Sequence, residues 1–143
     1  MAHPDLDRLL DYSLRFAQES LEKRGSFYPF AATVQPDGEL KPVAVYSGEE
    51  TPHVHVLLDM LSEKLKTLAL KRETLATAVC YDSLVSPDGD VRRKTEAIVV
   101  SLEHADGESV IVYLPYSKKL FGRYNYSSLV AIAGERKHFP PVR

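Results

Sequence analysis

Three Asp-Gly pairs divide much of this sequence into short apolar runs, and their positions constrain the fold more than any other feature. Asp37-Gly38, Asp88-Gly89 and Asp106-Gly107 each stand between two segments rich in valine, alanine or isoleucine. Asp-Gly is a preferred pair in hairpin turns, because glycine adopts positive φ without steric cost. The sequence therefore predicts three β-hairpins.

These turns define five strands. We expect a first hairpin and then a three-strand meander, with strands at Phe30–Val34, Leu40–Tyr46, Ala76–Val85, Val91–His104 and Ser109–Pro115. Pro42 has no backbone N–H to donate, so the second strand is predicted to lie at a sheet edge. In the fourth strand Ile98 and Val100 share one face while Ala97 and Val99 share the other. A sheet that is apolar on both faces needs helices, or a second subunit, on both.

Two amphipathic helices are predicted between and before these strands. Apolar residues recur at three- and four-residue spacing over about residues 5–24, and Gly25 follows as a stop signal. The second helix is expected to begin with Thr51 as its N-cap and Pro52 in its first turn, and to end near Leu70.

The segment Tyr124–Ala133 fits either a last strand or a short helix, and its valine and isoleucine content favours the strand. The whole chain, residues 1–143, is expected to form a single α+β domain. Its sheet is predicted to be mainly antiparallel, with five or six strands and the element order α-β-β-α-β-β-β.

This element order resembles that of roadblock-type and other profilin-like domains. The matching segments are Leu6–Arg24, Phe30–Tyr46, Val54–Leu70 and Ala76–Pro115. The resemblance implies a sheet order of 2-1-5-4-3, dimerisation, and a scaffolding or regulatory role without catalysis. The stretch from Thr95 to Tyr116, with Leu102-Glu103-His104 and Tyr113-Leu114-Pro115-Tyr116, is also similar to small uncharacterised bacterial proteins, from which no function transfers.

Charge is distributed unevenly along the chain. Residues 1–114 carry 12 basic and 19 acidic side chains, a net charge of −7, whereas residues 115–143 carry six basic side chains and one acidic, a net charge of +5. An acidic body with a basic end can attract an anionic partner or a second copy of the chain. The single cysteine, Cys80, and the absence of a long apolar run lead us to expect a cytoplasmic protein without membrane association.

Two groups of side chains are candidate chemical sites. Glu49, Glu50, His53 and His55 could bind a metal if His53 and His55 lay on a strand, but Thr51-Pro52 predicts a helix, on which residues two apart point about 200° apart. We therefore expect a solvated helix N-terminus and no metal.

A thiol nucleophile is the second possibility, with Cys80 beside Asp82 and His104. Cys80 lies in the middle of a predicted strand, where a small buried hydrophobic residue is the expected role. His104 is expected to be a solvated strand end, and His3 and His138 have no visible partner. Phosphate-loop, dinucleotide, hydrolase and metalloprotease motifs are absent, so the chain is predicted not to be an enzyme and to need no cofactor.

The segment Tyr116–Tyr126 is the predicted contact surface, because tyrosine and arginine are enriched at binding hot spots. Its candidate residues are Tyr116, Lys118, Lys119, Arg123, Tyr124 and Tyr126. A second aromatic group, Phe27, Tyr28 and Phe30, is expected to pack in the core or to line a ligand pocket.

We expect a small protein-interaction module, dimeric or bound to another protein, of scaffold, regulatory or immunity type. The alternative is a sensor-type domain that binds a small anionic ligand or nucleotide through the same basic segment. No dedicated nucleic-acid binding is predicted. Association that persists in high salt favours the first hypothesis, and salt-sensitive binding of phosphate ligands favours the second.

Overall fold

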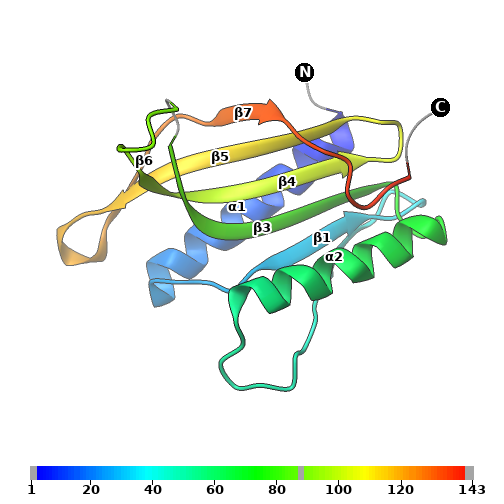
Figure 1. Cartoon of the computed structure of the whole chain (residues 1–143), viewed down its shortest axis with the longest axis horizontal. Coiled ribbons are helices and arrows are strands. Elements are labelled where there is room, and N and C mark those ends of the chain that lie inside the picture. Colours follow the sequence, from blue (N-terminus) through cyan, green and yellow to red (C-terminus); the bar gives the residue numbers. More distant parts are fainter. Residues whose placement is uncertain (1–2, 87–88, 141–143) are drawn as a thin grey trace.

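The computed structural model describes residues 3–86 and 89–140. Within these residues two α-helices and seven strands follow one another, and the seven strands join one sheet (Figure 1). The elements are α1 (Pro4–Arg24), β1 (Phe30–Val34), β2 (Leu40–Val43), α2 (Val54–Leu70), β3 (Ala76–Val85), β4 (Thr95–His104), β5 (Ser109–Lys118), η1 (Leu120–Gly122), β6 (Tyr124–Tyr126) and β7 (Val130–Ala133). The predicted α+β class and element order are confirmed.

Helix α1 covers the predicted residues and ends at the predicted stop signal, Gly25. The His3 side chain accepts a hydrogen bond from the Asp5 N–H as the N-cap, and Pro4 occupies the first turn. Gly25, with φ 77°, donates its N–H to the Leu21 carbonyl, which closes the C-terminal end in a left-handed conformation that glycine adopts readily.

Helix α2 begins later than predicted. Its N-cap is His53, whose side chain makes no capping hydrogen bond, and the first helical residue is Val54. Thr51 therefore does not cap the helix. Pro52 instead lines a groove with Tyr28, Tyr46 and Leu57, so the chain before the helix lies beside the second aromatic group.

The strand order is β2-β1-β3-β4-β5-β6, and β7 pairs separately with β5; every pairing is antiparallel. The predicted edge position of the Pro42 strand, β2, is confirmed. The sheet has one strand more than the upper prediction, because Tyr124–Ala133 forms two short strands in place of one. The likeness to roadblock-type domains is limited to element order, since β1 pairs with β3 and not with the fifth strand.

Strand ends differ from the predictions where the side chains are exposed. Strand β2 stops at Val43, β4 begins only at Thr95, and β5 continues to Lys118. Val91, which was expected in β4, is 75% exposed in the connection. The predicted turn at Ser86–Gly89 contains Pro87 and Asp88, which lie outside the described residues.

Helices α1 and α2 cover opposite faces of the sheet (Figure 1). Leu6, Leu9 and Leu21 of α1 pack against Ile98 and Val100. Leu61 and Leu65 of α2 pack against Ala31 and Val79. Along their strands these two residues alternate with the residues that face α1. The predicted cover on both faces is thus supplied by helices of the same chain.

The C-terminal segment, residues 134–140, covers β3 and β4 through a buried carboxylate. Glu103 is fully buried, and its Oε1 accepts the N–H groups of Lys137, His138 and Phe139 at 2.9, 3.0 and 3.5 Å. His138 Nδ1 lies 2.9 Å from Glu103 Oε2 and 2.9 Å from Thr77 Oγ1. The expectation that His138 has no partner is wrong, because the chain end folds back onto the sheet.

Candidate functional site

The predicted contact segment forms a turn at one end of the sheet. Strands β5 and β6 are joined by residues 118–123, here called the basic tip, and the Lys119 N–H donates to the Arg123 carbonyl at 2.6 Å. In Figure 1 this orange turn extends beyond the body of the molecule, at the end opposite to the two chain termini. The basic tip is therefore accessible from several directions.

Two apolar side chains are presented to solvent at the basic tip. Leu120 is 81% exposed and Phe121 is 98% exposed. Phe121 also has φ 63°, in the left-handed region that costs a non-glycine residue roughly 1–2 kcal/mol. Both residues lie inside the predicted segment but not among its six predicted contact residues.

The predicted cations surround this apolar pair. Lys118, Lys119 and Arg123 are exposed, and with Leu120 and Phe121 they line an open concave surface of about 850 Å³. In residues 3–86 and 89–140 none of the three cations forms an ion pair. Their charges are therefore available to a partner.

The three predicted tyrosines lie beneath the basic tip. Tyr116 is 5% exposed and donates its hydroxyl to Asp82, at 2.8 Å from Oδ1 and 2.9 Å from Oδ2. Tyr124 and Tyr126 are half-buried, and the three ring centroids lie 5.7 to 6.3 Å apart. Tyr116, Tyr124 and Tyr126 support the turn by packing against the α1 core, so that of the six predicted contact residues only the three cations line the open surface.

Burial changes the acidity of these groups. Burial is the main reason why the pKa of Tyr116 lies well above its usual range, and the nearby Asp82 raises this pKa further. Burial, with smaller effects from Glu22 and Tyr124, raises the pKa of Tyr126 to about 12. The pKa of Asp82 is itself raised, chiefly by burial. Tyr116 and Tyr126 stay neutral at physiological pH: Tyr116 hydrogen-bonds to Asp82, and Tyr126 acts as a packing group.

The thiol arrangement considered from the sequence does not form. Cys80 is fully buried, its Sγ lies 4.0 Å from the Ser13 carbonyl, and burial raises the pKa of its thiol well above the usual range. His104 lies near the end of the sheet, stacked on His3 and bonded to Asp5. Cys80 is a buried core residue, as predicted.

The other predicted clusters are also placed by the structure. His53 and His55 have ring centroids 5.7 Å apart and are exposed at the start of α2. Among the described residues, these histidines and the nearby Glu49 and Glu50 form no group of three close metal-ligating atoms. Phe27 and Phe30 pack against the core, while Tyr28 is 52% exposed beside an open groove of about 610 Å³.

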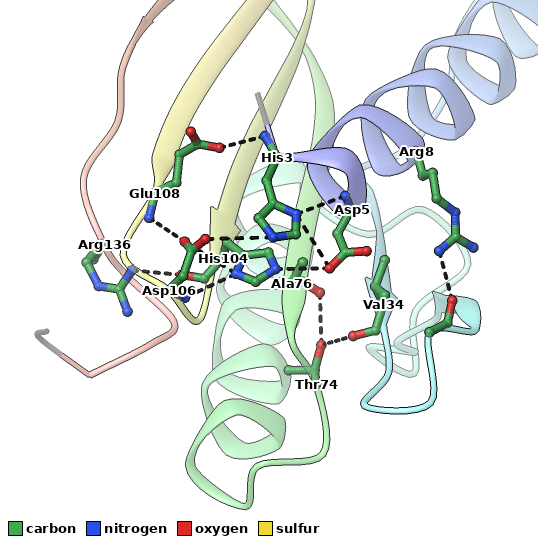
Figure 2. A network of polar contacts seen from close by, with 11 residues as sticks. His3, Asp5, Arg8, Val34, Thr74, Ala76, His104, Asp106, Glu108 and Arg136 are labelled. Atoms are coloured by element: carbon green, nitrogen blue, oxygen red, sulfur yellow. Dashed lines mark hydrogen bonds and ion pairs between the residues drawn. The ribbon is translucent and has the colours of Figure 1, made fainter. Parts of the chain in front are cut away.

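Three histidine expectations were wrong: besides His138, His3 was expected to have no partner but caps α1 and stacks on His104, and His104 was expected to be solvated. His104 is 7% exposed and lies in a polar network with His3, Asp5 and Asp106 (Figure 2). Its main partner Asp5 is 99 residues away in the sequence, so no local spacing could reveal the contact. The only local signal is the Asp106-Gly107 turn immediately after the strand.

Comparison with protein-family models, with curated proteins and with solved structures finds no match. Within the described part of the chain, neither helix combines the length and apolar character needed to cross a bilayer. The functional conclusion therefore rests on the geometry of this chain.

Proposed function

We propose that this protein is a non-enzymatic interaction module that associates with a second copy of itself through the basic tip. Leu120 and Phe121 are the apolar anchors of the contact, and Lys118, Lys119 and Arg123 are its charged rim. An apolar centre with a polar rim is the usual anatomy of a protein–protein interface.

The exposure of Phe121 carries this proposal. Its side chain is 98% exposed although its backbone is held at φ 63°. Left-handed strain at a non-glycine residue persists where the surrounding structure imposes it, and such residues cluster at functional sites. Here the β5–β6 pairing imposes the turn, and nothing within the described chain covers the ring. A partner that buries Phe121 would remove roughly 200 Å² of apolar surface from water.

Charge favours a second copy as the partner. The basic tip carries Lys118, Lys119 and Arg123, whereas residues 1–114 have a net charge of −7. Two basic tips repel each other, so the tip of one copy is expected to contact the acidic body of the other, and reciprocal contacts of this kind close a two-fold dimer.

Sedimentation velocity on the purified protein tests the proposal. We expect the sedimentation coefficient to rise from the monomer to the dimer value with increasing concentration. We also expect the dimer to persist in high salt, because the anchors are apolar and screening weakens only the charged rim. A monomer at high micromolar concentration would contradict the proposal.

The alternative, a domain that binds a small anionic ligand, is tested on the same protein. A nucleoside triphosphate is titrated into the protein at low and high salt. If the chain stays monomeric and binds the nucleotide only at low salt, the sensor hypothesis replaces the interaction module. If the dimer forms without nucleotide and nucleotide does not bind, the interaction module stands.

A further inference from the structure

A cluster of histidines and carboxylates lies at the opposite end of the sheet from the basic tip. His3 comes from the N-cap of α1, His104 is the last residue of β4, and Asp106 lies in the β4–β5 turn. Figure 2 shows them converging where the start of α1 crosses the end of β4. This histidine cluster lies outside the basic tip.

The two imidazole rings are stacked and faced by carboxylates on both sides. Their centroids are 3.8 Å apart, at an interplanar angle of 27°. Asp5 Oδ2 lies 3.0 Å from His104 Nε2 and 3.6 Å from His3 Nδ1. Asp106 lies on the other side, with Oδ1 3.3 Å from His104 Nδ1 and Oδ2 3.8 Å from His3 Nε2.

The side facing Asp106 contains the donor atoms of a metal site. One ligand atom each from His3, His104 and Asp106 can be chosen so that all three lie within 4.8 Å of one another. Imidazole nitrogen and carboxylate oxygen are ordinary Zn²⁺ ligands at about 2.0–2.2 Å. Inward shifts of the exposed Asp106 and partly exposed His3 side chains would bring the three atoms to a shared ion.

Asp5 occupies the position expected of an outer carboxylate at such a site. Metal-ligating histidines usually donate their second ring N–H to a carboxylate or carbonyl, which fixes the ring orientation. Asp5 faces the far nitrogen of both rings at once, and the 3.0 Å contact to His104 is a hydrogen bond. In the metal-free structure His104 Nδ1 accepts the Asp106 N–H at 3.1 Å and His3 Nδ1 accepts the Asp5 N–H at 3.1 Å. A bound ion would take the Nδ1 lone pair of His104 in place of the Asp106 N–H. It would take His3 through Nε2, whose ring proton would move to Nδ1 and be donated to Asp5.

Charge and access also favour a divalent cation. Asp5, Asp106 and Glu108 bring three negative charges, and Arg136, which donates to the His104 carbonyl, brings one positive charge. If both imidazoles are neutral, these four charged side chains together carry a net charge of −2. The His104 side chain is 9% exposed, His3 33% and Asp106 49%, so the cluster is closed on the side of the core and open on the side of Asp106.

We propose that His3, His104 and Asp106 bind a divalent transition-metal ion of the Zn²⁺ class, with Asp5 orienting both imidazoles. Three protein ligands leave the fourth tetrahedral position to water. The bound ion joins the start of α1 to the β4–β5 turn, so it stabilises the folded chain, and this stabilisation grows with the logarithm of the free ion concentration above the dissociation constant.

Calorimetric titration of Zn²⁺ alone into tag-free, metal-depleted protein tests the site. We expect one ion per chain, a higher melting temperature with Zn²⁺, and, with Co²⁺ as a spectroscopic probe, the visible absorption of a tetrahedral complex. His3→Ala is expected to weaken binding at least about tenfold, while leaving the metal-free protein folded because the His3 side chain is partly exposed. Asp106→Asn, at an exposed position in the turn, is expected to weaken it similarly.

The matched control is His55→Ala, which removes an exposed histidine beside another histidine at the start of α2. It is expected to bind Zn²⁺ as the wild type does. The proposal fails if the wild type binds no Zn²⁺, if His3→Ala and Asp106→Asn bind normally, or if His55→Ala is the variant that loses binding.

Discussion

Replacing Glu103 with alanine is expected to destabilise the protein by about 3–5 kcal/mol, the range for removing one partner of a buried charged pair. Glu103 is fully buried, and three successive N–H groups and His138 depend on its carboxylate. Without it, these donors lose their acceptor, and the C-terminal segment loses its main polar attachment to β4. Urea unfolding measures the change in the free energy of unfolding.

Glu96→Ala is the control, because Glu96 lies on the same strand but is exposed. We expect it to change stability by less than about 0.5 kcal/mol. A Glu103→Ala protein as stable as the control would show that the carboxylate does not hold the C-terminal segment.

The stabilisation from Glu103 depends on pH. Burial alone would raise the pKa of Glu103, but the hydrogen bonds and charge of His138, together with the Lys137 N–H, outweigh burial and hold the pKa below its usual range. A lowered pKa in the folded state means that this stabilisation is complete above the pKa of an unfolded glutamate and is lost as pH falls through the folded value. The stability difference between wild type and Glu103→Ala should therefore shrink in acid.

The second large effect is expected at Phe121. Phe121→Gly removes the exposed ring and relieves the positive φ, so self-association should weaken at least about 30-fold while the monomer gains about 1 kcal/mol of stability. Sedimentation measures the first quantity, and urea unfolding at a concentration where the chain is monomeric measures the second. Opposite changes in association and stability are characteristic of a residue that is kept for binding.

Tyr46→Ser is the matched control, since Tyr46 is another aromatic residue that is 79% exposed, far from the basic tip in sequence. It should leave the dimer intact. If Tyr46→Ser weakens self-association as much as Phe121→Gly does, the association is non-specific. If Phe121→Gly associates as strongly as the wild type, the basic tip is not part of the interface.

The sequence predicted most helices and strands correctly, because these elements depend on residues that are close together in the chain. The limits of β3, Ala76–Val85, agree with the structure, since the apolar run and the flanking turn residues specify a strand. The predicted start of α2 was wrong because Thr51-Pro52 is only a local capping signal: the helix begins after His53, and Pro52 lies outside it, beside a groove that Tyr28 and Tyr46 also line. Strand order could not be deduced from element order, which permits β1 to pair with either end of the meander.

The buried polar contacts were missed because their partners are distant in the sequence. His138 and Thr77 are 61 residues apart, and His104 and Asp5 are 99 apart. Composition identified the segment Tyr116–Tyr126 but could not separate its tyrosines, which pack beneath the turn, from its cations, which stay in water. That division follows from where the chain leaves the sheet. Lys119 and Arg123 lie outside the paired strands, and Lys118 is exposed at the last paired position of β5. The sequence did not specify these strand ends.

Photo-crosslinking from position 121 tests the central claim most directly. Phe121 is replaced by the photoreactive residue p-benzoylphenylalanine, which keeps an aromatic ring at the basic tip, and the purified protein is irradiated at a concentration where sedimentation detects association. We predict cross-linked dimers in which residue 121 of one copy is joined to the acidic body, residues 1–114, of the other. Only monomers after irradiation, or dimers joined elsewhere by a general cross-linker but not from residue 121, would contradict the proposed role of the basic tip.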